Sequence, residues 1–191
     1  MPKVVSLFKT NNVKTILDVG CGTGRHIVYL AQEGFDVYGL DESKTAIQIA
    51  KKWLNTEKLK AKFSIGNQYE KFPFAKQFFD AVISTQALHH GTTKEVKKVI
   101  REIEHALKDN GIIFITVARK LCSKEIKPSY YPMSKSKQIE KNVYVPLEGK
   151  EKGLPHFLFN KTLIRKMFSN FRLKNIYKDD SHYCFVGYKK M

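Results

Sequence analysis

Apolar residues along the chain form two kinds of segment. Short runs rich in β-branched and aromatic residues are typical of buried strands, and longer stretches with apolar residues three and four positions apart are typical of helices. The segments that predict strands cover residues 15–19, 36–40, 61–65, 78–84, 112–118, 173–177 and 183–188. Helices are predicted between them, at 25–32, after Ser43, from Thr92 and after Asn160.

The clearest helix signal follows Thr92. Thr92 and Glu95 have the spacing of a capping box, and apolar residues continue with helical spacing as far as Leu107. Asn110 and Gly111 are expected to stop this helix, before the almost wholly apolar strand 112–118.

Strands that alternate with helices predict a parallel sheet with right-handed crossovers. We therefore expect an α/β fold: a Rossmann-like, doubly wound, mostly parallel seven-stranded sheet that ends in a C-terminal antiparallel hairpin. A chain of 191 residues suits one domain, residues 1–191. In such folds the carboxyl ends of the strands meet at one crevice, here near Gly20, Asp41, Asn67 and residues 84–90.

A glycine loop, ILDVGCGTG at 16–24, follows the first predicted strand. Glycines permit positive backbone dihedrals and let the main chain lie close to a ligand. Arg25 stands where a dinucleotide fingerprint requires its third glycine, so a dinucleotide is not expected. The carboxylates of Asp18 and Asp41 instead suit an ammonium group or ribose hydroxyls, although a buried strut and a helix N-cap are the ordinary alternatives for them.

This pattern resembles the class I S-adenosylmethionine-dependent methyltransferases, in particular small single-domain proteins of the methyltransferase type 11 kind. The resemblance covers nearly the whole chain. It is carried by the glycine loop, by Asp41 at the end of the second strand, and by the pairs and triplets Gly66-Asn67, Phe72-Pro73-Phe74 and Phe79-Asp80.

The resemblance implies S-adenosylmethionine as the cofactor and assigns residues to its parts. The methionine part would lie against the first loop and the end of the fourth strand, at Asp18, Gly20, Cys21, Gly22, Gly24, Ser84 and Gln86. Asp41, with Glu42 beside it, would hold the ribose hydroxyls. Asn67 would lie near the adenine amino group, where the family often has aspartate.

Candidates for the acceptor side are His89, His90, Arg119 and His156. One of the paired histidines is expected to face the crevice, while Arg119 as a surface residue and His156 as a core residue are the ordinary alternatives. Residues 119–159 are too irregular for a standard crossover and are expected to form an inserted lid or acceptor-binding segment. Its Tyr130, Tyr131, Lys124, Lys127, Lys135 and Lys137 suit a planar or phosphate-bearing acceptor. A partner subunit that covers the site is the alternative.

The net charge of +16 is unevenly distributed. Residues 1–118 carry a net +5 and residues 119–180 a net +9. Such a field attracts phosphates, so RNA is an alternative partner, although lysine-rich surfaces are also ordinary solvated faces. Three cysteines without disulfide or metal-site spacing predict a reducing compartment and no metal site. No apolar run is long enough for a membrane span. A cytoplasmic location is therefore expected.

Three functions follow. The first is an enzyme that methylates a small molecule. The second is an RNA methyltransferase, because residues 87–90 (ALHH), the basic second half and residues 182–186 (HYCFV) look somewhat like tRNA wobble-uridine methyltransferases. The third is a non-catalytic cofactor-binding or regulatory partner. The fold does not distinguish them, because acceptor choice depends on the lid.

Overall fold

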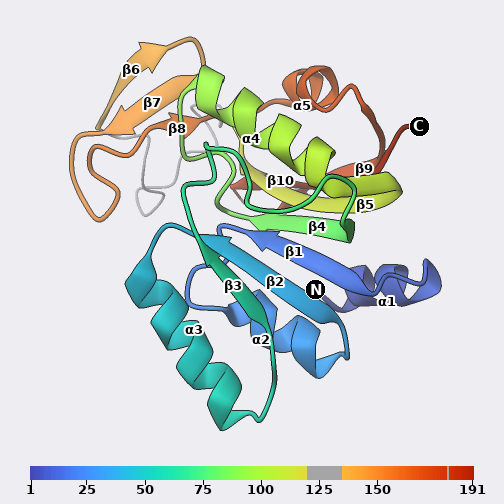
Figure 1. The fold of residues 1–191 in the computed structure, drawn as a ribbon. Helices are drawn as coiled ribbons and strands as arrows, with labels where there is room; N and C mark the ends of the chain where they lie inside the picture. Colours follow the sequence, from blue (N-terminus) through green and yellow to red (C-terminus); the bar gives the residue numbers. More distant parts are fainter. Residues whose placement is uncertain (120–134, 180) are drawn as a thin grey trace.

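The computed structural model describes residues 1–119, 135–179 and 181–191. Its centre is a seven-stranded sheet with the order β3-β2-β1-β4-β5-β10-β9 (Figure 1). The first five strands of the chain are parallel, whereas β10 is antiparallel to both β5 and β9. The strands of this sheet are β1 (Thr15–Val19), β2 (Asp36–Asp41), β3 (Lys62–Ile65), β4 (Phe79–Thr85), β5 (Leu107–Ala118), β9 (Phe171–Asp179) and β10 (His182–Lys189). The predicted mixed, doubly wound sheet is confirmed.

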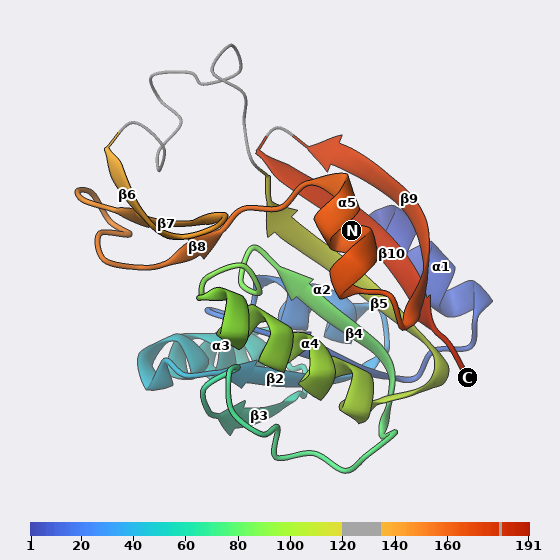
Figure 2. The ribbon, with the colours of Figure 1, turned by 90° about the horizontal axis from the view of Figure 1, so that it is seen from above.

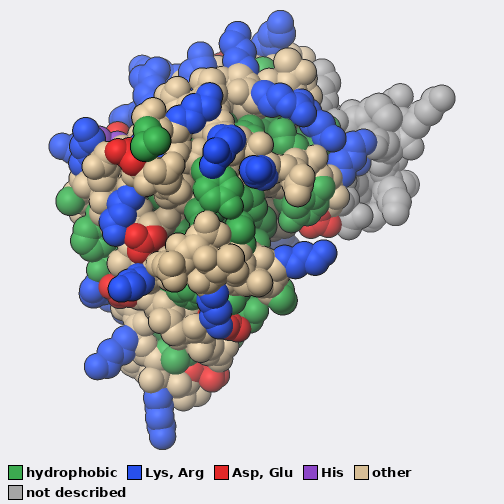
Figure 3. Space-filling model, turned by 90° about the vertical axis from the view of Figure 1, so that its right-hand side faces the viewer, with side chains coloured by type: hydrophobic (Ala, Val, Ile, Leu, Met, Phe, Trp, Pro, Cys, Tyr) green, Lys and Arg blue, Asp and Glu red, His purple; other side chains and the backbone are tan. Residues whose placement is uncertain are grey.

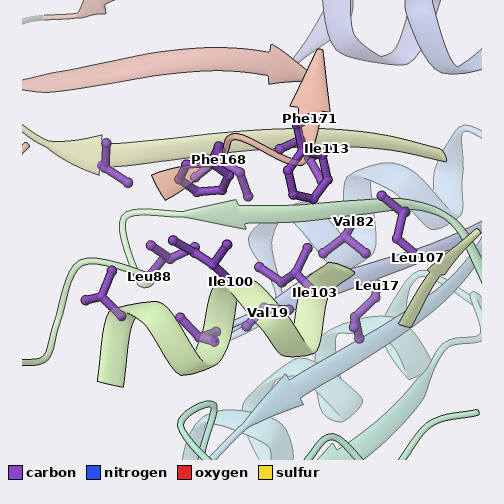
Figure 4. Packing of buried hydrophobic residues seen from close by; sticks show 14 of the residues in the cluster. Leu17, Val19, Val82, Leu88, Ile100, Ile103, Leu107, Ile113, Phe168 and Phe171 are labelled. Carbon is purple, nitrogen blue, oxygen red and sulfur yellow. The ribbon is translucent and has the colours of Figure 1, made fainter. Parts of the chain in front are cut away.

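Helices cover both faces of the sheet, as the two views of the ribbon show (Figures 1 and 2). One face packs against α1 (Pro2–Thr10), α2 (Arg25–Gln32) and α3 (Lys44–Thr56), and the other against α4 (Thr93–Ala106) and α5 (Lys161–Met167). Each face has its own apolar core. Figure 4 shows the second core, where Ile100 and Ile103 of α4 pack near Val82 of β4.

The alternation of side chains along the central strands explains the two cores. On β5, Ile113 and Ile115 belong to the core under α4, whereas Ile112 and Phe114 belong to the core under α1 and α2. All four side chains are buried. A strand covered on both faces must be apolar at successive positions, which is the pattern seen in the sequence.

The predicted helix caps are present. The Ser43 Oγ accepts a hydrogen bond from the Ala46 N–H, and the Asn160 Oδ1 accepts one from the Leu163 N–H. Thr92 and Glu95 form the reciprocal capping box at the start of α4.

The largest boundary difference from the prediction lies between α4 and β5. The helix that begins after Thr92 ends at Ala106, not at Asn110-Gly111, because Leu107 already has an extended backbone and pairs with Phe79. The register then shifts, so Ala81 pairs with Ile112 and residues 108–111 form an irregular start to β5. Helix α1 was not predicted, although Val4, Val5 and Phe8 have helical spacing and are buried.

The described part of the 119–159 segment contains a small antiparallel sheet, which the irregular sequence did not predict. Its strands are β6 (Ser136–Glu140), β7 (Val143–Pro146) and β8 (His156–Phe157). The Phe157 N–H donates to the His89 carbonyl at 2.8 Å and the Phe159 N–H donates to the Ala118 carbonyl at 2.9 Å. These bonds attach the small sheet to the carboxyl ends of β4 and β5. Tyr130, Tyr131, Lys124 and Lys127 lie outside the described residues.

The helices of the described ranges are short or polar. None of them has the length and apolar character needed to span a membrane.

Candidate cofactor and acceptor site

A cavity of about 310 Å³ lies at the carboxyl ends of the parallel strands. The loops after β1, β2, β3 and β4 converge on it, as the strand order requires. One further residue, Leu154, comes from the segment that precedes β8. The cavity is lined by Gly20, Leu40, Asp41, Glu42, Gly66, Gln68, Tyr69, Gln86, Ala87, His90 and Leu154.

The glycine loop is held in a shape that only glycine adopts easily. Gly20 has a φ of +74°, and a Cβ there would overlap the Cβ of Ala87 on the loop after β4. Gly24 has a φ of +89°, caps the start of α2, and would place a Cβ 2.6 Å from that of Ala50. The two glycines let the loop pass close to its neighbours and leave main-chain atoms facing the crevice.

Asp41 joins the tip of β2 to this loop. Its Oδ2 accepts a hydrogen bond from the Gly22 N–H at 2.7 Å, and its Oδ1 accepts one from the Ser43 N–H at 2.9 Å. A carboxylate has about four lone-pair sites, so Asp41 keeps acceptor capacity for a ligand. Glu42 is exposed and lies beside it on the cavity wall. The two carboxylates suit a pair of ribose hydroxyls.

Asp18 is buried on β1, immediately before the loop, with only 1% of its surface exposed. Its Oδ1 has no hydrogen-bond partner among the described residues. Burial, reinforced by the Asp41 carboxylate and opposed by Arg25, raises the pKa of Asp18 to about 7. A buried acceptor without a partner fits a site that receives a polar or cationic ligand.

Three predicted cofactor residues have their side chains engaged elsewhere. The Cys21 side chain is buried in the core under α2, next to Gly39. The Ser84 hydroxyl is buried and donates to the Val19 carbonyl at 2.9 Å. The Asn67 Oδ1 accepts from the Tyr69 N–H at 2.8 Å, and Asn67 is absent from the residues that line the cavity.

Gln86 is on the cavity wall, as predicted, in an uncommon backbone conformation. Its φ is +58°, and its N–H donates to the Thr116 Oγ1 at 2.8 Å. Gln68 and Tyr69, which the sequence analysis did not single out, complete this side. The Gln68 Nε2 donates to the Tyr69 hydroxyl and to the Ala87 carbonyl. Their position one and two residues after Asn67 was the available signal.

Histidines gather around one residue of the cavity wall. His90 lies on the wall, while His89 and His156 are each 3% exposed. The His90 ring centroid is 4.3 Å from that of His89 and 4.8 Å from that of His156. The sequence analysis did not propose His182 of β10 for the site. Its ring centroid lies 5.5 Å from that of His89.

These imidazoles are neutral at pH 7. Burial, together with the neighbouring His156 and His182, lowers the pKa of His90 to about 4. Burial likewise lowers the pKa of His89, His156 and His182. A neutral imidazole offers one lone pair, so each ring can accept a hydrogen bond or bind a cation.

Arg119 lies immediately after β5 and beside this group of elements. Its N–H donates to the Ser181 carbonyl at 2.9 Å, and its backbone forms an isolated bridge with Phe159. Arg119 is absent from the residues that line the cavity. Its predicted contact with an acceptor stays a prediction.

Comparison with known proteins identifies the family. The family model described as "Methyltransferase domain" matches residues 16–111, which contain the glycine loop, Asp41 and the end of β4. An uncharacterized methyltransferase of Synechocystis is 36% identical over 97 residues, which are 51% of this chain and 43% of that protein. The ubiquinone biosynthesis O-methyltransferase of Pelagibacter ubique is 31% identical over 109 residues, or 57% of this chain and 43% of that protein. The chain thus matches less than half the length of these relatives.

Solved structures share the fold over most of the chain. A protein from Pyrococcus horikoshii has a TM-score of 0.78 at 23% identity, covering 97% of this chain and 86% of that one. The 1,6-didemethyltoxoflavin-N1-methyltransferase of Burkholderia thailandensis, solved with bound 1,6-didemethyltoxoflavin and S-adenosylhomocysteine, has a TM-score of 0.73 at 16% identity, covering 100% of this chain and 77% of that one. Together with the strand order and the glycine loop, the family match shows that the chain belongs to the methyltransferase domain family.

Proposed function

We propose that this chain transfers a methyl group from S-adenosylmethionine to a small-molecule acceptor. The observation that carries the proposal is the cavity itself, in which a glycine loop, two carboxylates and a histidine face the same space. When bound, the cofactor supplies an electrophilic methyl group on a sulfonium. Main-chain atoms at Gly20 and acceptors at Asp41 and Glu42 line the cavity and fit the cofactor. The buried Asp18, just before the loop and outside the lining, keeps an unpartnered Oδ1.

The wall formed by His90 and Leu154 supports a compact acceptor. Methyl transfer needs a nucleophile held in line and water kept out, and positioning supplies much of the rate. Leu154 belongs to the inserted segment, so residues 119–159 would act as the lid. His90 would contribute its ring to this wall rather than act as a base, because burial lowers its pKa to about 4 and makes it a poor proton acceptor at pH 7.

The names of two similar proteins agree with a small acceptor. One is an O-methyltransferase of ubiquinone biosynthesis, and the other an N1-methyltransferase with 1,6-didemethyltoxoflavin bound. A cavity of about 310 Å³ is at the lower end of the range for small-molecule sites, about 300–1,000 Å³.

An RNA acceptor is the second candidate, favoured by the net +9 of residues 119–180. The face in Figure 3 carries lysine and arginine side chains over much of its extent, with acidic side chains between them. On that face the positive charge is thus not confined to one groove of the kind that follows a nucleic acid backbone.

The test is incubation of the chain with an extract of small molecules and RNA and a cofactor that carries an isotopically labelled methyl group. Mass spectrometry of the two fractions then locates the label. We expect it in a small molecule, and less of it with Asp41→Ala at the same cofactor concentration. Label in tRNA, with tRNA binding that weakens steeply as salt rises, would replace this proposal by the RNA alternative. No label in either fraction would favour the non-catalytic partner.

A further inference from the structure

Four of the six histidines in the sequence gather where the loop after β4 meets β8 and β10. Three of them, His89, His90 and His156, each offer a ligand atom, and these atoms all lie within 4.8 Å of one another. Histidines are uncommon in protein interiors, so a packed group of them calls for an explanation beyond apolar packing.

Hydrogen bonding does not supply that explanation. The His89 Nδ1 and the His156 Nε2 are buried and have no hydrogen-bond partner among the described residues. Buried polar atoms of native proteins are nearly always paired, and each exception calls for a cause, such as an ion. Both orphaned nitrogens belong to the group whose ligand atoms converge.

A carboxylate stands next to the same nitrogens. The Glu151 Oε2 lies 3.5 Å from the His156 Nε2, and its Oε1 lies 4.0 Å from the His90 Nε2. Glu151 precedes β8 and is 44% exposed at its side chain, so it closes the group on the solvent side. Three imidazoles and one carboxylate are a ligand set typical of Zn²⁺ and of neighbouring divalent transition metals.

We propose that His89, His90 and His156 bind a divalent first-row transition-metal ion of the Zn²⁺ type, with the Glu151 carboxylate in the fourth position. The sequence predicts no metal site, because its cysteines lack metal-site spacing and His156 is far along the chain from the adjacent His89 and His90. Tetrahedral Zn²⁺ with bonds of about 2.0–2.1 Å places its ligand atoms roughly 3.3 Å apart, so the ring nitrogens must approach by about 1 Å or more on binding. Rotation of the rings and a small shift of the loop before β8 would bring them together.

Such an ion would connect two parts of the site. His89 and His90 belong to the loop after β4, whereas Glu151 and His156 belong to the inserted segment that also places Leu154 on the cavity wall. The ion would therefore fix that segment against the sheet and set the shape of the acceptor side. The inference goes beyond the proposed function and does not depend on the identity of the acceptor.

The test uses the untagged full chain and two probes, Zn²⁺ and Co²⁺. After dialysis against Zn²⁺ and then against metal-free buffer, we expect one equivalent of zinc per chain by elemental analysis. Co²⁺ should give the intense visible absorption of a tetrahedral site. His156→Ala and His89→Ala should each lower the affinity at least about 10-fold, whereas His105→Ala, a histidine on the exposed side of α4, should leave it unchanged.

Glu151→Gln keeps the test valid if a buried-histidine variant does not fold, because Glu151 is exposed. It should weaken zinc binding about 10-fold without changing the melting temperature of the metal-free chain. Zinc binding that is absent from the wild type, or equally strong in the His156 and Glu151 variants, would overturn the proposal. Calorimetry of S-adenosylhomocysteine on the same samples reports on the methyltransferase proposal separately.

Discussion

The Asp41 carboxylate accepts a hydrogen bond from the Gly22 N–H at 2.7 Å, which ties the tip of β2 to the glycine loop after β1. The residue assigned to the ribose therefore also shapes the loop assigned to the methionine part. Changes at Asp41 should act on both the contact with the ligand and the loop that receives it.

Asp41→Ala should weaken the binding of S-adenosylhomocysteine by about 1–3 kcal/mol, the usual cost of lost charge-assisted hydrogen bonds. Isothermal titration calorimetry measures the effect. Asp36→Ala is the matched control, because Asp36 lies at the other end of the same strand, where it pairs with Lys62. Equal affinity of wild type and Asp41→Ala would remove Asp41 from the site.

Gly20→Ala should cost more stability than an alanine at another glycine with a positive φ. The new Cβ would overlap Ala87, so backbone strain and steric conflict together should lower the free energy of unfolding by roughly 2–5 kcal/mol. Gly34→Ala is the control, with a φ of +90° and open space around its Cβ, and should cost only about 1–2 kcal/mol. Urea denaturation compares the two, and similar losses would show that the loop after β4 yields to a Cβ at Gly20.

Asp18→Asn should change how the free energy of unfolding depends on pH. The folded chain keeps the Asp18 proton up to a pKa of about 7, whereas the unfolded chain loses it near 3.8. The stabilisation by this group is therefore fully present below pH 3.8 and is lost as pH rises through 7. Asparagine does not titrate, so the stability of wild type minus that of the variant should fall by a few kcal/mol between about pH 4 and pH 7. Urea titrations at several pH values measure this difference, and a constant value would contradict it.

Asp80 clamps the amino ends of β1 and β4 and should show the opposite dependence. Burial acts to raise its pKa, but hydrogen bonds from Lys108, Thr15 and Lys14 outweigh burial and lower the pKa to about 2. Its stabilisation is present above about pH 4 and lost as pH falls toward 2. Because the carboxylate is partly screened by solvent, Asp80→Asn should cost roughly 1–2 kcal/mol at pH 7 and little at pH 2. Thermal melts at the two pH values are the measurement, and an equal loss at both would refute the clamp.

Elements that depend on nearby residues were predictable from the sequence, whereas elements that depend on pairing with distant strands were not. Side-chain periodicity and caps such as Thr92 and Asn160 are local, so the strands, most helices and the hairpin were predictable. The end of α4 was not, because Leu107 takes its conformation from pairing with Phe79 on another strand. The same limit applied to the three-stranded sheet, whose strands are short and whose apolar residues lack a clear period.

Within the site, the sequence predicted which loops line the crevice, but not which side chains of those loops point into it. The glycine loop, Asp41, Gln86 and His90 are where the topology brings strand ends together. Cys21 and Ser84 adjoin these residues in sequence, but their side chains are buried in the interior. The approach of His156 and His182 to His89 depends on the inserted segment and on β10, which local patterns do not place.

The central claim is that the cavity at the ends of β1, β2 and β4 receives S-adenosylmethionine. A crystal structure of the chain grown with saturating S-adenosylhomocysteine tests it most directly. We predict the compound in this cavity, with its ribose hydroxyls within hydrogen-bond distance of Asp41 or Glu42 and its chain beside Gly20. Density for the compound elsewhere on the molecule, or a cavity that contains only water under those conditions, would contradict the claim.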